Sequence, residues 1–292
     1  MADTVAVVGL GAMGLPMARC LLRKGFGVRG FDVRAAALDA LQAAGGDACG
    51  SPAEAGSDAH IAMLVVLNAD QVEQVMFGAD GLVHSLAPGT VVASMATMSP
   101  HRTRSLGARA VSEGLRWLDT PISGGTQRAA EGSLTTMVGG EANDLERARA
   151  MLQAFSRHVF HLGPVGSGAT AKMVNQMLVY CHLAAAVEAM TLCRKAGADA
   201  QAVYDVICTA MGASAIFESR IPRLIDGTLE SGGSMRIAMK DLAIVEDTAR
   251  ELGMPTLMTA QATQLYRAAA AMGFIDADDL AVARVVESLS GL

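Results

Sequence analysis

The stretch "VAVVGLGAMG" near the N-terminus constrains the fold of this chain more than any other feature. An apolar run typical of a buried strand leads into a glycine-rich turn, and a helical pattern begins near Leu15. Gly9 permits a tight turn, Gly11 lets a ligand approach the backbone, and Gly14 lets the helix pack closely on the strand. The helix N-terminus offers unpaired N–H groups to an anion. The turn therefore predicts a pyrophosphate site, with an ordinary glycine-rich turn as the alternative. Its residues are Gly9, Leu10, Gly11, Ala12, Met13 and Gly14.

The next predicted strand, "GVRGFD", ends in Asp32. An acidic residue about 20 positions after the last glycine is placed to hydrogen-bond the ribose diol of a dinucleotide. A carboxylate there would repel a 2′-phosphate, so we expect NAD to be preferred over NADP. Arg34 lies close enough to weaken that preference, and NADP stays possible. Asp32, Val33 and Arg34 are therefore predicted cofactor contacts.

Residues 1–164 alternate short β-branched runs with amphipathic helical stretches, the pattern of an α/β domain with parallel strands and helices on both faces. A glycine-rich boundary, "GPVGSGAT", follows. Residues 165–292 contain no convincing strand and are predicted to form an all-helical domain. The expected strands are "TVAVVG", "GVRGFD", "HIAMLVVL", "TVVASM", "RWLDTP", "LTTMVGG" and "HVFHLG". The expected helices cover 170–196, about 200–211, 215–226, 234–253 and 256–272, with one more at the end.

The first of these helices contains "AKMVNQMLVYCHLAAAVEAM", which is nearly apolar enough to cross a membrane. Its charged and amide side chains would be costly in lipid, so a helix buried in protein is the better interpretation and no membrane contact is expected. Lys172, Asn175 and Gln176 share one face, because residues i, i+3 and i+4 of a helix are neighbours. A polar patch beside a domain boundary suits a ligand, since clefts between domains are common binding sites. The alternative is a solvated helix start.

A buried lysine is suited to acid/base chemistry. Oxidising an alcohol with a nicotinamide requires removal of the hydroxyl proton as the hydride leaves, and the reverse reaction requires delivery of a proton. A lysine whose pKa is lowered by burial can do either near neutral pH. Asn175 would then hold the oxygens of the substrate. In "DTPISGGTQRAAEG", Ser123, Gly124 and Gly125 form a turn whose N–H groups and hydroxyl suit a carboxylate, although such turns are common.

The charge, cysteine content and N-terminal residues of the chain argue against a nucleic-acid-binding, secreted or metal-binding protein. The net charge of −6 and the absence of a basic stripe do not suit a nucleic-acid partner. Five scattered cysteines without a C-x-x-C pair indicate reduced thiols in the cytoplasm, and the first residues lack the basic region of a signal peptide. No metal is expected, since His158 and His161 would lie on opposite faces of a strand.

Together these features resemble the β-hydroxyacid dehydrogenase family, which is related to 6-phosphogluconate dehydrogenase. The resemblance covers essentially the whole chain through four motifs in family order. These are "GLGAMGLPMARCLLRKG", "DTPISGGTQRAAEG", "GSGATAKMVNQ" and "MKDLAIVEDTA". It implies a Rossmann doubly wound sheet followed by an all-α C-terminal domain on a long connecting helix. It also implies a small hydroxy-acid substrate and a homodimer or homotetramer.

The resemblance also implies roles for individual residues. Lys172 would be the acid/base, and Ser123, Gly124 and Asn175 would bind the carboxylate and hydroxyl of the substrate. The remaining implied contacts are with the cofactor and come from Leu67, Asn68, Thr97 and Lys240.

The sequence departs from the family pattern in ways that bear on substrate choice. Gln176 stands where many members have a second Asn, and Ser94 where an Asp is usual. Near the C-terminus, Ile275 and Leu280 replace a common glycine and serine. The lysine-to-glutamine segment resembles the branch that oxidises L-threonate, and a longer amide at Gln176 suits a substrate with extra hydroxyls. The alternatives are a 3-hydroxyisobutyrate dehydrogenase, a tartronate semialdehyde reductase, or a non-catalytic NAD-binding sensor.

Overall fold

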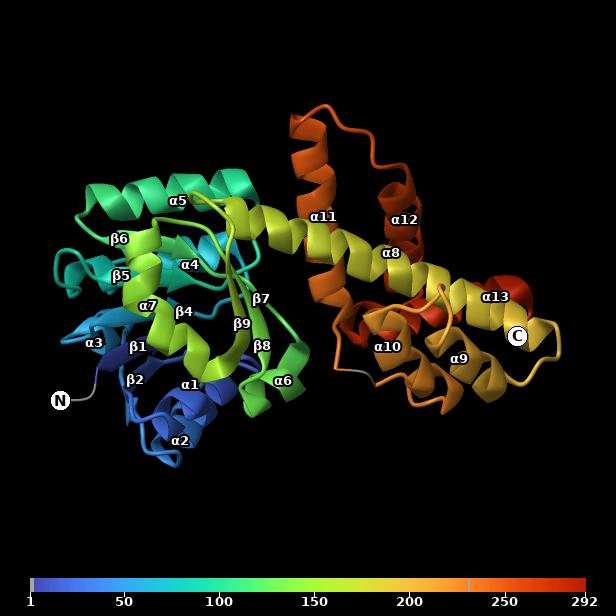
Figure 1. The fold of residues 1–292 in the computed structure, drawn as a ribbon, viewed down its shortest axis with the longest axis horizontal. Coiled ribbons are helices and arrows are strands. Elements are labelled where there is room, and N and C mark those ends of the chain that lie inside the picture. Colours follow the sequence, from blue (N-terminus) through green and yellow to red (C-terminus); the bar gives the residue numbers. More distant parts are fainter. Residues whose placement is uncertain (1–2, 231) are drawn as a thin grey trace. The chain divides into compact units, whose positions relative to one another are not determined.

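The computed structural model describes residues 3–230 and 232–292 (Figure 1). The chain divides into two compact units, Met1–Lys172 and Met173–Leu292. The N-terminal unit contains all of the strands among the described residues, whereas the C-terminal unit is helical there. The expected α/β domain and all-helical domain are therefore confirmed.

A parallel six-stranded sheet with the order β3-β2-β1-β4-β5-β6 organises the N-terminal unit. The order reverses between β1 and β4, and doubly wound sheets bind their ligands at such a switch point, outside the carboxyl ends of the strands. The strands are β1 Thr4–Val8, β2 Gly27–Phe31, β3 Asp47–Ala48, β4 Ile61–Leu64, β5 Val91–Ser94 and β6 Arg116–Asp119.

Successive residues of β1 show why both faces of this sheet must be covered. Val5 and Val7 belong to one apolar cluster, whereas Ala6 and Val8 belong to another, and none of the four is more than 1% exposed. Side chains of a strand alternate between faces, so each cluster fills one layer between sheet and helices. The helices of this unit are α1 Gly14–Arg23, α2 Ala35–Gln42, α3 Pro52–Gly56, α4 Ala69–Phe77, η1 Leu82–His84, α5 Pro100–Ser112, α6 Gly125–Glu131 and α7 Ala142–Phe155.

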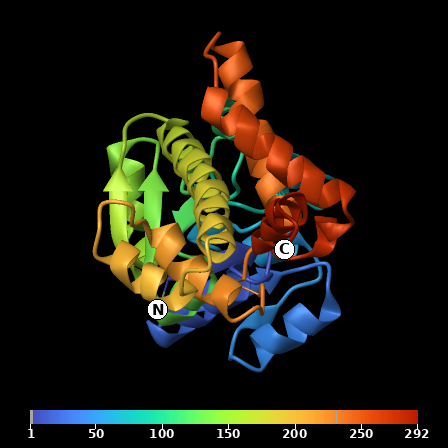
Figure 2. The same cartoon turned by 90° about the vertical axis from the view of Figure 1, so that its right-hand side faces the viewer.

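The last strands of this unit form a separate three-stranded sheet with the order β7-β8-β9. Its strands are β7 Ile122–Ser123, β8 Leu134–Val138 and β9 Ser156–His161. β8 and β9 run parallel and lie side by side in Figure 2, whereas β7 pairs antiparallel with β8. The sequence predicted β8 and β9 but not this second sheet, because the two-residue strand β7 is too short to show an alternating pattern. The expectation of parallel strands is therefore corrected for β7.

Helix α8, Ser167–Lys195, begins in the N-terminal unit and continues into the C-terminal one. By length and composition it is the one helix among the described residues that meets the criteria for a membrane span. Its residues Leu183, Val187 and Met190 are nevertheless at most 2% exposed and belong to the apolar core of the C-terminal unit. That packing supports the interpretation of α8 as a core helix.

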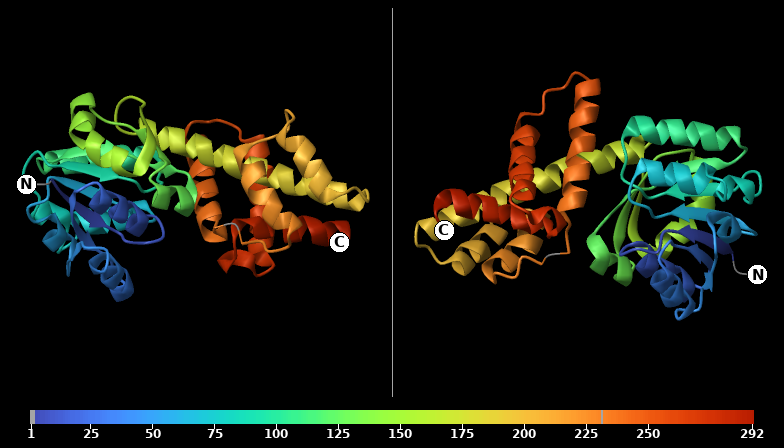
Figure 3. Two further views of the ribbon diagram at one scale, coloured as in Figure 1. Left: turned by 60° about the horizontal axis from the view of Figure 1, so that its bottom comes forward. Right: turned by 180° about the vertical axis from the view of Figure 1, so that it is seen from behind.

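The other helices of the C-terminal unit follow the predicted runs within a few residues. α11 and α12 lie side by side, joined by a short connection (Figure 3). The helices are α9 Ala200–Cys208, α10 Ala215–Ile225, α11 Met235–Glu251, α12 Leu257–Ala271, η2 Phe274–Asp276, η3 Asp279–Val282 and α13 Ala283–Ser290.

Candidate active site

Most of the predicted cofactor residues lie at one edge of the six-stranded sheet. The glycine turn follows β1, Asp32 follows β2, Leu67 and Asn68 follow β4, and Thr97 follows β5. The carboxyl ends of parallel strands share an edge, so the sheet itself gathers these positions at its switch point.

Glycine is favoured at the three positions of the turn for different reasons. Gly9 has φ +99°, and a Cβ there would lie 2.3 Å from the carbonyl oxygen of Val65. A Cβ on Gly14 would lie 1.9 Å from the carbonyl oxygen of Gly9. A Cβ on Gly11 would meet nothing closer than the guanidinium of Arg34, at 3.8 Å. Gly9 and Gly14 are therefore required by the fold, whereas the space above Gly11 is open to a ligand.

Asp32 is the most heavily hydrogen-bonded of these side chains. Its Oδ2 accepts from the backbone N–H of Leu10 at 2.8 Å, and its Oδ1 accepts from the backbone N–H of Arg34 at 2.9 Å. The guanidinium of Arg34 donates to both oxygens, at 2.9 and 3.1 Å. Burial tends to raise the pKa of Asp32, but the hydrogen bonds from Arg34 and Leu10 outweigh it, and the pKa is lowered. Asp32 is therefore an ionised acceptor.

A cavity of about 390 Å³ lies against this turn. It is lined by Leu10, Gly11 and Ala12, by the start of α1, and by Arg34 with the small residues of α2. The first turn of α1 carries no acidic residue, so no side chain competes with an anion for its N–H groups. Gly11, the helix start and Asp32 fit the pyrophosphate and ribose of a dinucleotide.

The residues after β4 and β5 are placed by helix starts. Asn68 caps α4, because its Oδ1 accepts from the backbone N–H of Gln71 at 2.9 Å. Leu67 is 47% exposed and donates its backbone N–H to Gln71 Oε1 at 2.7 Å. Thr97 lies between β5 and α5. The structure thus gives Asn68 a structural role, and contact of these three residues with a cofactor stays a prediction.

The predicted carboxylate turn lies where β7 leads into α6. Ser123 ends the strand, and Gly124 and Gly125 have φ +139° and +72°, which favour glycine. A Cβ on Gly124 would also lie 2.9 Å from Cδ of Arg128, whereas Gly125 has open space around it. The turn therefore exposes backbone at Gly125.

Asp119, at the end of β6, fixes the first turn of α8. Its Oδ1 accepts from the backbone N–H of Gly166 at 2.8 Å, and its Oδ2 accepts from that of Ala169 at 2.7 Å. A Cβ on Gly168 would lie 2.8 Å from Asp119 Oδ2 and 2.4 Å from the carbonyl oxygen of Met137, so glycine is needed for this approach. The carboxylate satisfies N–H groups that a helix start leaves unpaired.

Lys172 follows one turn later on α8 and is only 8% exposed. A buried ammonium requires partners or a polar environment, and Lys172 is not without a partner in the structure. Asp119 therefore fixes the position of the helical turn that bears the predicted acid/base.

Further along α8, Asn175 and Gln176 enter a hydrogen-bonded group within the C-terminal unit. Asn175 Nδ2 donates to Gln176 Oε1 at 2.9 Å. Gln176 Nε2 donates to Asp241 Oδ2 at 2.6 Å and to the hydroxyl of Tyr180 at 3.2 Å. Gln176 is 8% exposed, whereas Asn175 is half-buried. A direct contact of Gln176 with a substrate stays a prediction.

Comparison with known proteins gives a consistent result over nearly the whole chain. Residues 4–163 match the NAD binding domain of 6-phosphogluconate dehydrogenase, and residues 166–286 match the NAD-binding domain of NADP-dependent 3-hydroxyisobutyrate dehydrogenase. L-threonate dehydrogenase of Cupriavidus necator is 41% identical over 98% of this chain and 96% of its own. The 2-(hydroxymethyl)glutarate dehydrogenase of Eubacterium barkeri is 34% identical over 99% of this chain and 96% of its own.

A solved structure agrees with these sequence relatives. The crystal structure of 3-hydroxyisobutyrate dehydrogenase from Salmonella typhimurium superposes with a TM-score of 0.90 at 35% identity, covering 97% of this chain and 99% of that one. The chain belongs to the β-hydroxyacid dehydrogenase family. It is an NAD(P)-dependent hydroxyacid dehydrogenase, and the expected Rossmann fold and enzyme class are confirmed.

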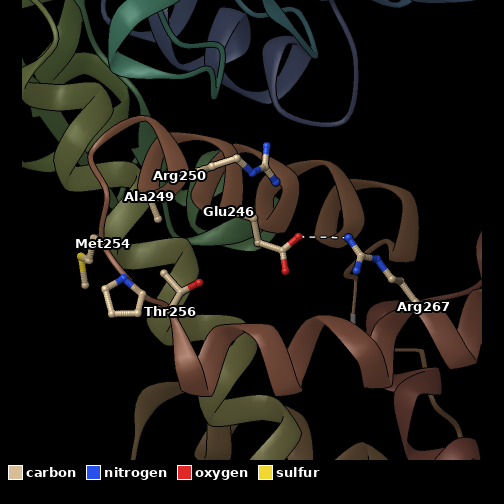
Figure 4. A pocket seen from close by; sticks show the side chains of 7 residues that line it. Glu246, Ala249, Arg250, Met254, Thr256 and Arg267 are labelled. Atoms are coloured by element: carbon tan, nitrogen blue, oxygen red, sulfur yellow. Dashed lines mark hydrogen bonds and ion pairs between the residues drawn. The ribbon is translucent and has the colours of Figure 1, made fainter.

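Lys240 of this dehydrogenase lies on α11, beside Asp241. Its Nζ is 2.8 Å from Asp241 Oδ1, and Asp241 is 2% exposed. A second cavity, of about 410 Å³, lies between α11 and α12 (Figure 4). There Glu246 and Arg267 form an ion pair at 3.0 Å. This open surface pocket contains none of the predicted site residues.

Two carboxylates of this dehydrogenase hold other parts of the candidate site in place and were not predicted from the sequence. Asp119 lies in the expected strand "RWLDTP" and at the start of the motif "DTPISGGTQRAAEG", and Asp241 lies in the motif with Lys240, but neither was predicted as a site residue. Both are at most 2% exposed, and each binds a segment distant in sequence. A buried carboxylate needs such partners, so an aspartate ending an apolar strand, or lying on the apolar face of a helix, was the available signal.

Proposed function

We propose that this dehydrogenase oxidises a short polyhydroxylated acid of the L-threonate type, with NAD as the acceptor and Lys172 as the acid/base. The observation that carries this proposal is the buried Lys172, on a helix whose first turn Asp119 fixes to the end of β6. The similarity to an L-threonate dehydrogenase over nearly the whole chain supports the substrate class.

The chain's own residues supply the proton transfer and the binding of substrate. When bound, NAD would supply the hydride acceptor. Lys172 Nζ accepts the hydroxyl proton as that hydride leaves the carbon, and it returns a proton to the carbonyl oxygen in the reverse direction. Ser123, Gly124 and Gly125 bind the carboxylate through backbone N–H groups and a hydroxyl. Asn175 binds an oxygen of the substrate, with Gln176 beside it.

The cofactor contacts follow from the switch point of the sheet. The turn from Gly9 to Gly14 and the start of α1 bind the pyrophosphate. Asp32 binds the ribose diol, which gives NAD its advantage over NADP, and Val33 and Arg34 lie beside it. The remaining contacts come from Leu67, Asn68, Thr97 and Lys240. We retain residues 1–164 as the NAD-binding domain and 165–292 as the substrate and oligomerisation domain.

A panel of short hydroxy acids tests this function. Purified enzyme is mixed with NAD and with L-threonate, 3-hydroxyisobutyrate or L-serine, and reduced cofactor is followed by absorbance; tartronate semialdehyde is tested with reduced cofactor. We expect kcat/KM to be highest for L-threonate. A clear advantage for 3-hydroxyisobutyrate, or for tartronate semialdehyde, would overturn the substrate and leave the enzyme class intact.

We also propose that the enzyme is a cytoplasmic homodimer or homotetramer associating through its helical unit. Large apolar side chains cluster where α11 leads into α12, and they are 55–74% exposed. A second copy of this chain is the proposed partner for this cluster, because water-exposed apolar clusters mark association sites. The cluster consists of Leu252, Met254, Leu257 and Met258.

Light scattering after size-exclusion chromatography tests the oligomer. The double variant Leu257→Glu with Met258→Glu is expected to lower the molecular mass of the particle. Leu289→Glu is the control, because Leu289 is also exposed, at 84%, but lies on α13. An unchanged mass in the double variant would overturn this interface.

A further inference from the structure

A group of polar side chains inside the C-terminal unit is not explained by binding of cofactor. Gln176 Nε2 donates its two N–H groups, one to Asp241 Oδ2 at 2.6 Å and one to the hydroxyl of Tyr180 at 3.2 Å. Tyr180 in turn donates to Asp241 Oδ2 at 3.3 Å. Burial, and then the charge of Asp241, raise the pKa of Tyr180 well above its usual range, so the phenol keeps its proton and donates it.

Asp241 determines which way the Gln176 amide faces. A carboxylate only accepts hydrogen bonds, so the amide must turn its NH₂ toward Asp241. The opposite orientation would place Gln176 Oε1 against Asp241 Oδ2 at the 2.6 Å that now separates Nε2 from that oxygen. Both groups are at most 8% exposed, and water does not relieve such a repulsion between acceptors.

The orientation of Gln176 determines that of Asn175. With its NH₂ committed to Asp241 and Tyr180, Gln176 presents Oε1 to its neighbour. Asn175 must therefore turn its NH₂ group toward that oxygen, and its Nδ2 donates to it at 2.9 Å. The carbonyl oxygen of the planar Asn175 amide then points away from Gln176. Asn175 Oδ1 has no hydrogen-bond partner in the described part of the chain, and the side chain is half-buried.

We propose that Asp241, acting through Gln176, orients Asn175 so that its carbonyl oxygen accepts a hydrogen bond from a hydroxyl of the substrate. An acceptor at this position favours a hydroxyl and disfavours a carboxylate, which has no proton to donate. Asp241 and Gln176 are positioning residues for substrate hydroxyls, and Asn175 makes the contact. This inference rests on the proposed function and narrows its substrate class to acids with a hydroxyl at Asn175.

Exchange of donor and acceptor between positions 176 and 241 tests the proposal. In Asp241→Asn, the new amide keeps its oxygen toward the ammonium of Lys240 and turns its NH₂ toward Gln176. The Gln176 amide then flips to present its oxygen to position 241, and the Asn175 amide flips in response. In the double variant Asp241→Asn with Gln176→Glu, Asn at 241 donates to the carboxylate at 176. That carboxylate again accepts from Asn175, and the net charge of the pair is unchanged.

The kinetic expectation separates positioning from general damage. In Asp241→Asn, KM for the polyhydroxylated acid is expected to rise about tenfold, the loss of one well-placed hydrogen bond, while KM for NAD stays within about twofold. The double variant is expected to restore KM for the acid. Asp247→Asn is the matched control, because it makes the same change on α11 at a side chain that is 63% exposed, and KM is expected not to change.

Two results would overturn the proposal. One is an unchanged KM for the acid in Asp241→Asn, and the other is a double variant no better than the single variants in a folded protein. If wild-type enzyme oxidises no hydroxy acid, the proposed function fails, and the melting temperatures of the same variants then test the hydrogen-bonded group alone. A lower melting temperature in Gln176→Glu alone, where two carboxylates would meet, with recovery in the double variant, would support the group, and additive losses would contradict it.

Discussion

Asp119 Oδ2 accepts a hydrogen bond of 2.7 Å from the backbone N–H of Ala169, in the turn of α8 that precedes Lys172. With the bond from Gly166 to Oδ1, this contact attaches the helix that bears Lys172, the proposed acid/base, to the end of β6, the edge strand of the six-stranded sheet. The sheet therefore positions the lysine through one side chain.

Replacing Asp119 by Ala is expected to destabilise the fold and lower kcat. The substitution leaves two backbone N–H groups without their acceptor, and each buried unsatisfied group costs about 1–3 kcal/mol. Asp119→Asn keeps one acceptor oxygen and is expected to lose less of both. Urea unfolding and kcat for the three proteins check this order, and equal stability of wild type and Asp119→Ala would contradict it.

The contribution of Asp119 to the stability of the fold is expected to decrease as pH rises. Burial raises the pKa of this carboxyl above its ordinary value of 3.8, although the backbone N–H groups of Gly166 and Ala169 oppose the shift. A carboxyl with a raised pKa stabilises the fold fully below its ordinary pKa, and that contribution is lost as pH rises through the raised value. We expect the melting temperature of wild type, relative to Asp119→Asn, to fall as pH rises from 4 toward neutral. A rising difference would contradict this sign.

Two glycines of the turn are expected to be needed for different reasons, Gly14 for folding and Gly11 for binding of NAD. A Cβ at position 14 would lie 1.9 Å from the carbonyl oxygen of Gly9, so Gly14→Ala is expected to lower the melting temperature strongly. Gly11→Ala meets no atom closer than 3.8 Å and is expected to fold normally but bind NAD at least about tenfold more weakly, because the methyl group occupies the approach to the backbone. Calorimetry measures both, and normal NAD affinity in Gly11→Ala would contradict the pyrophosphate site.

Cofactor preference is expected to depend on Asp32 and Arg34 in opposite ways. Asp32→Ser removes the acceptor for the ribose diol and the repulsion of a 2′-phosphate, so the ratio of kcat/KM for NAD to that for NADP is expected to fall about tenfold or more. Arg34→Ala removes a cation that is 59% exposed, and is expected to reduce kcat/KM for NADP more than for NAD. Preference of the wild type for NADP would contradict this role of Asp32.

The extent to which the sequence predicts this fold depends on the range of the interactions. The strand, glycine turn and helix from Thr4 to Arg23 show their periodicity and turn chemistry within about 20 residues, and they form as expected. The two-residue strand β7 depends on pairing with β8, which no local pattern reveals. Its antiparallel direction was therefore missed.

Prediction of the candidate site from the sequence is limited in the same way, by contacts between distant residues. The positions of Lys172, Asn175 and Gln176 on one helix follow from their spacing alone. The hydrogen bond from Gln176 to Asp241 joins residues on α8 and α11, and the bonds of Asp119 join β6 to α8. Such contacts depend on tertiary packing, so the sequence suggested which residues are polar and buried but not which of them are partners.

The most direct test of the account is the turnover of Lys172→Ala with NAD and the best acid of the panel. The control is Lys195→Ala, because Lys195 lies at the other end of the same helix and donates to the carbonyl oxygen of Ser290 at 2.6 Å. We expect kcat of Lys172→Ala to fall at least about 100-fold, the contribution of a general acid/base, with the melting temperature and NAD affinity retained and Lys195→Ala near wild type. A Lys172→Ala enzyme that turns over at the wild-type rate would contradict the central claim.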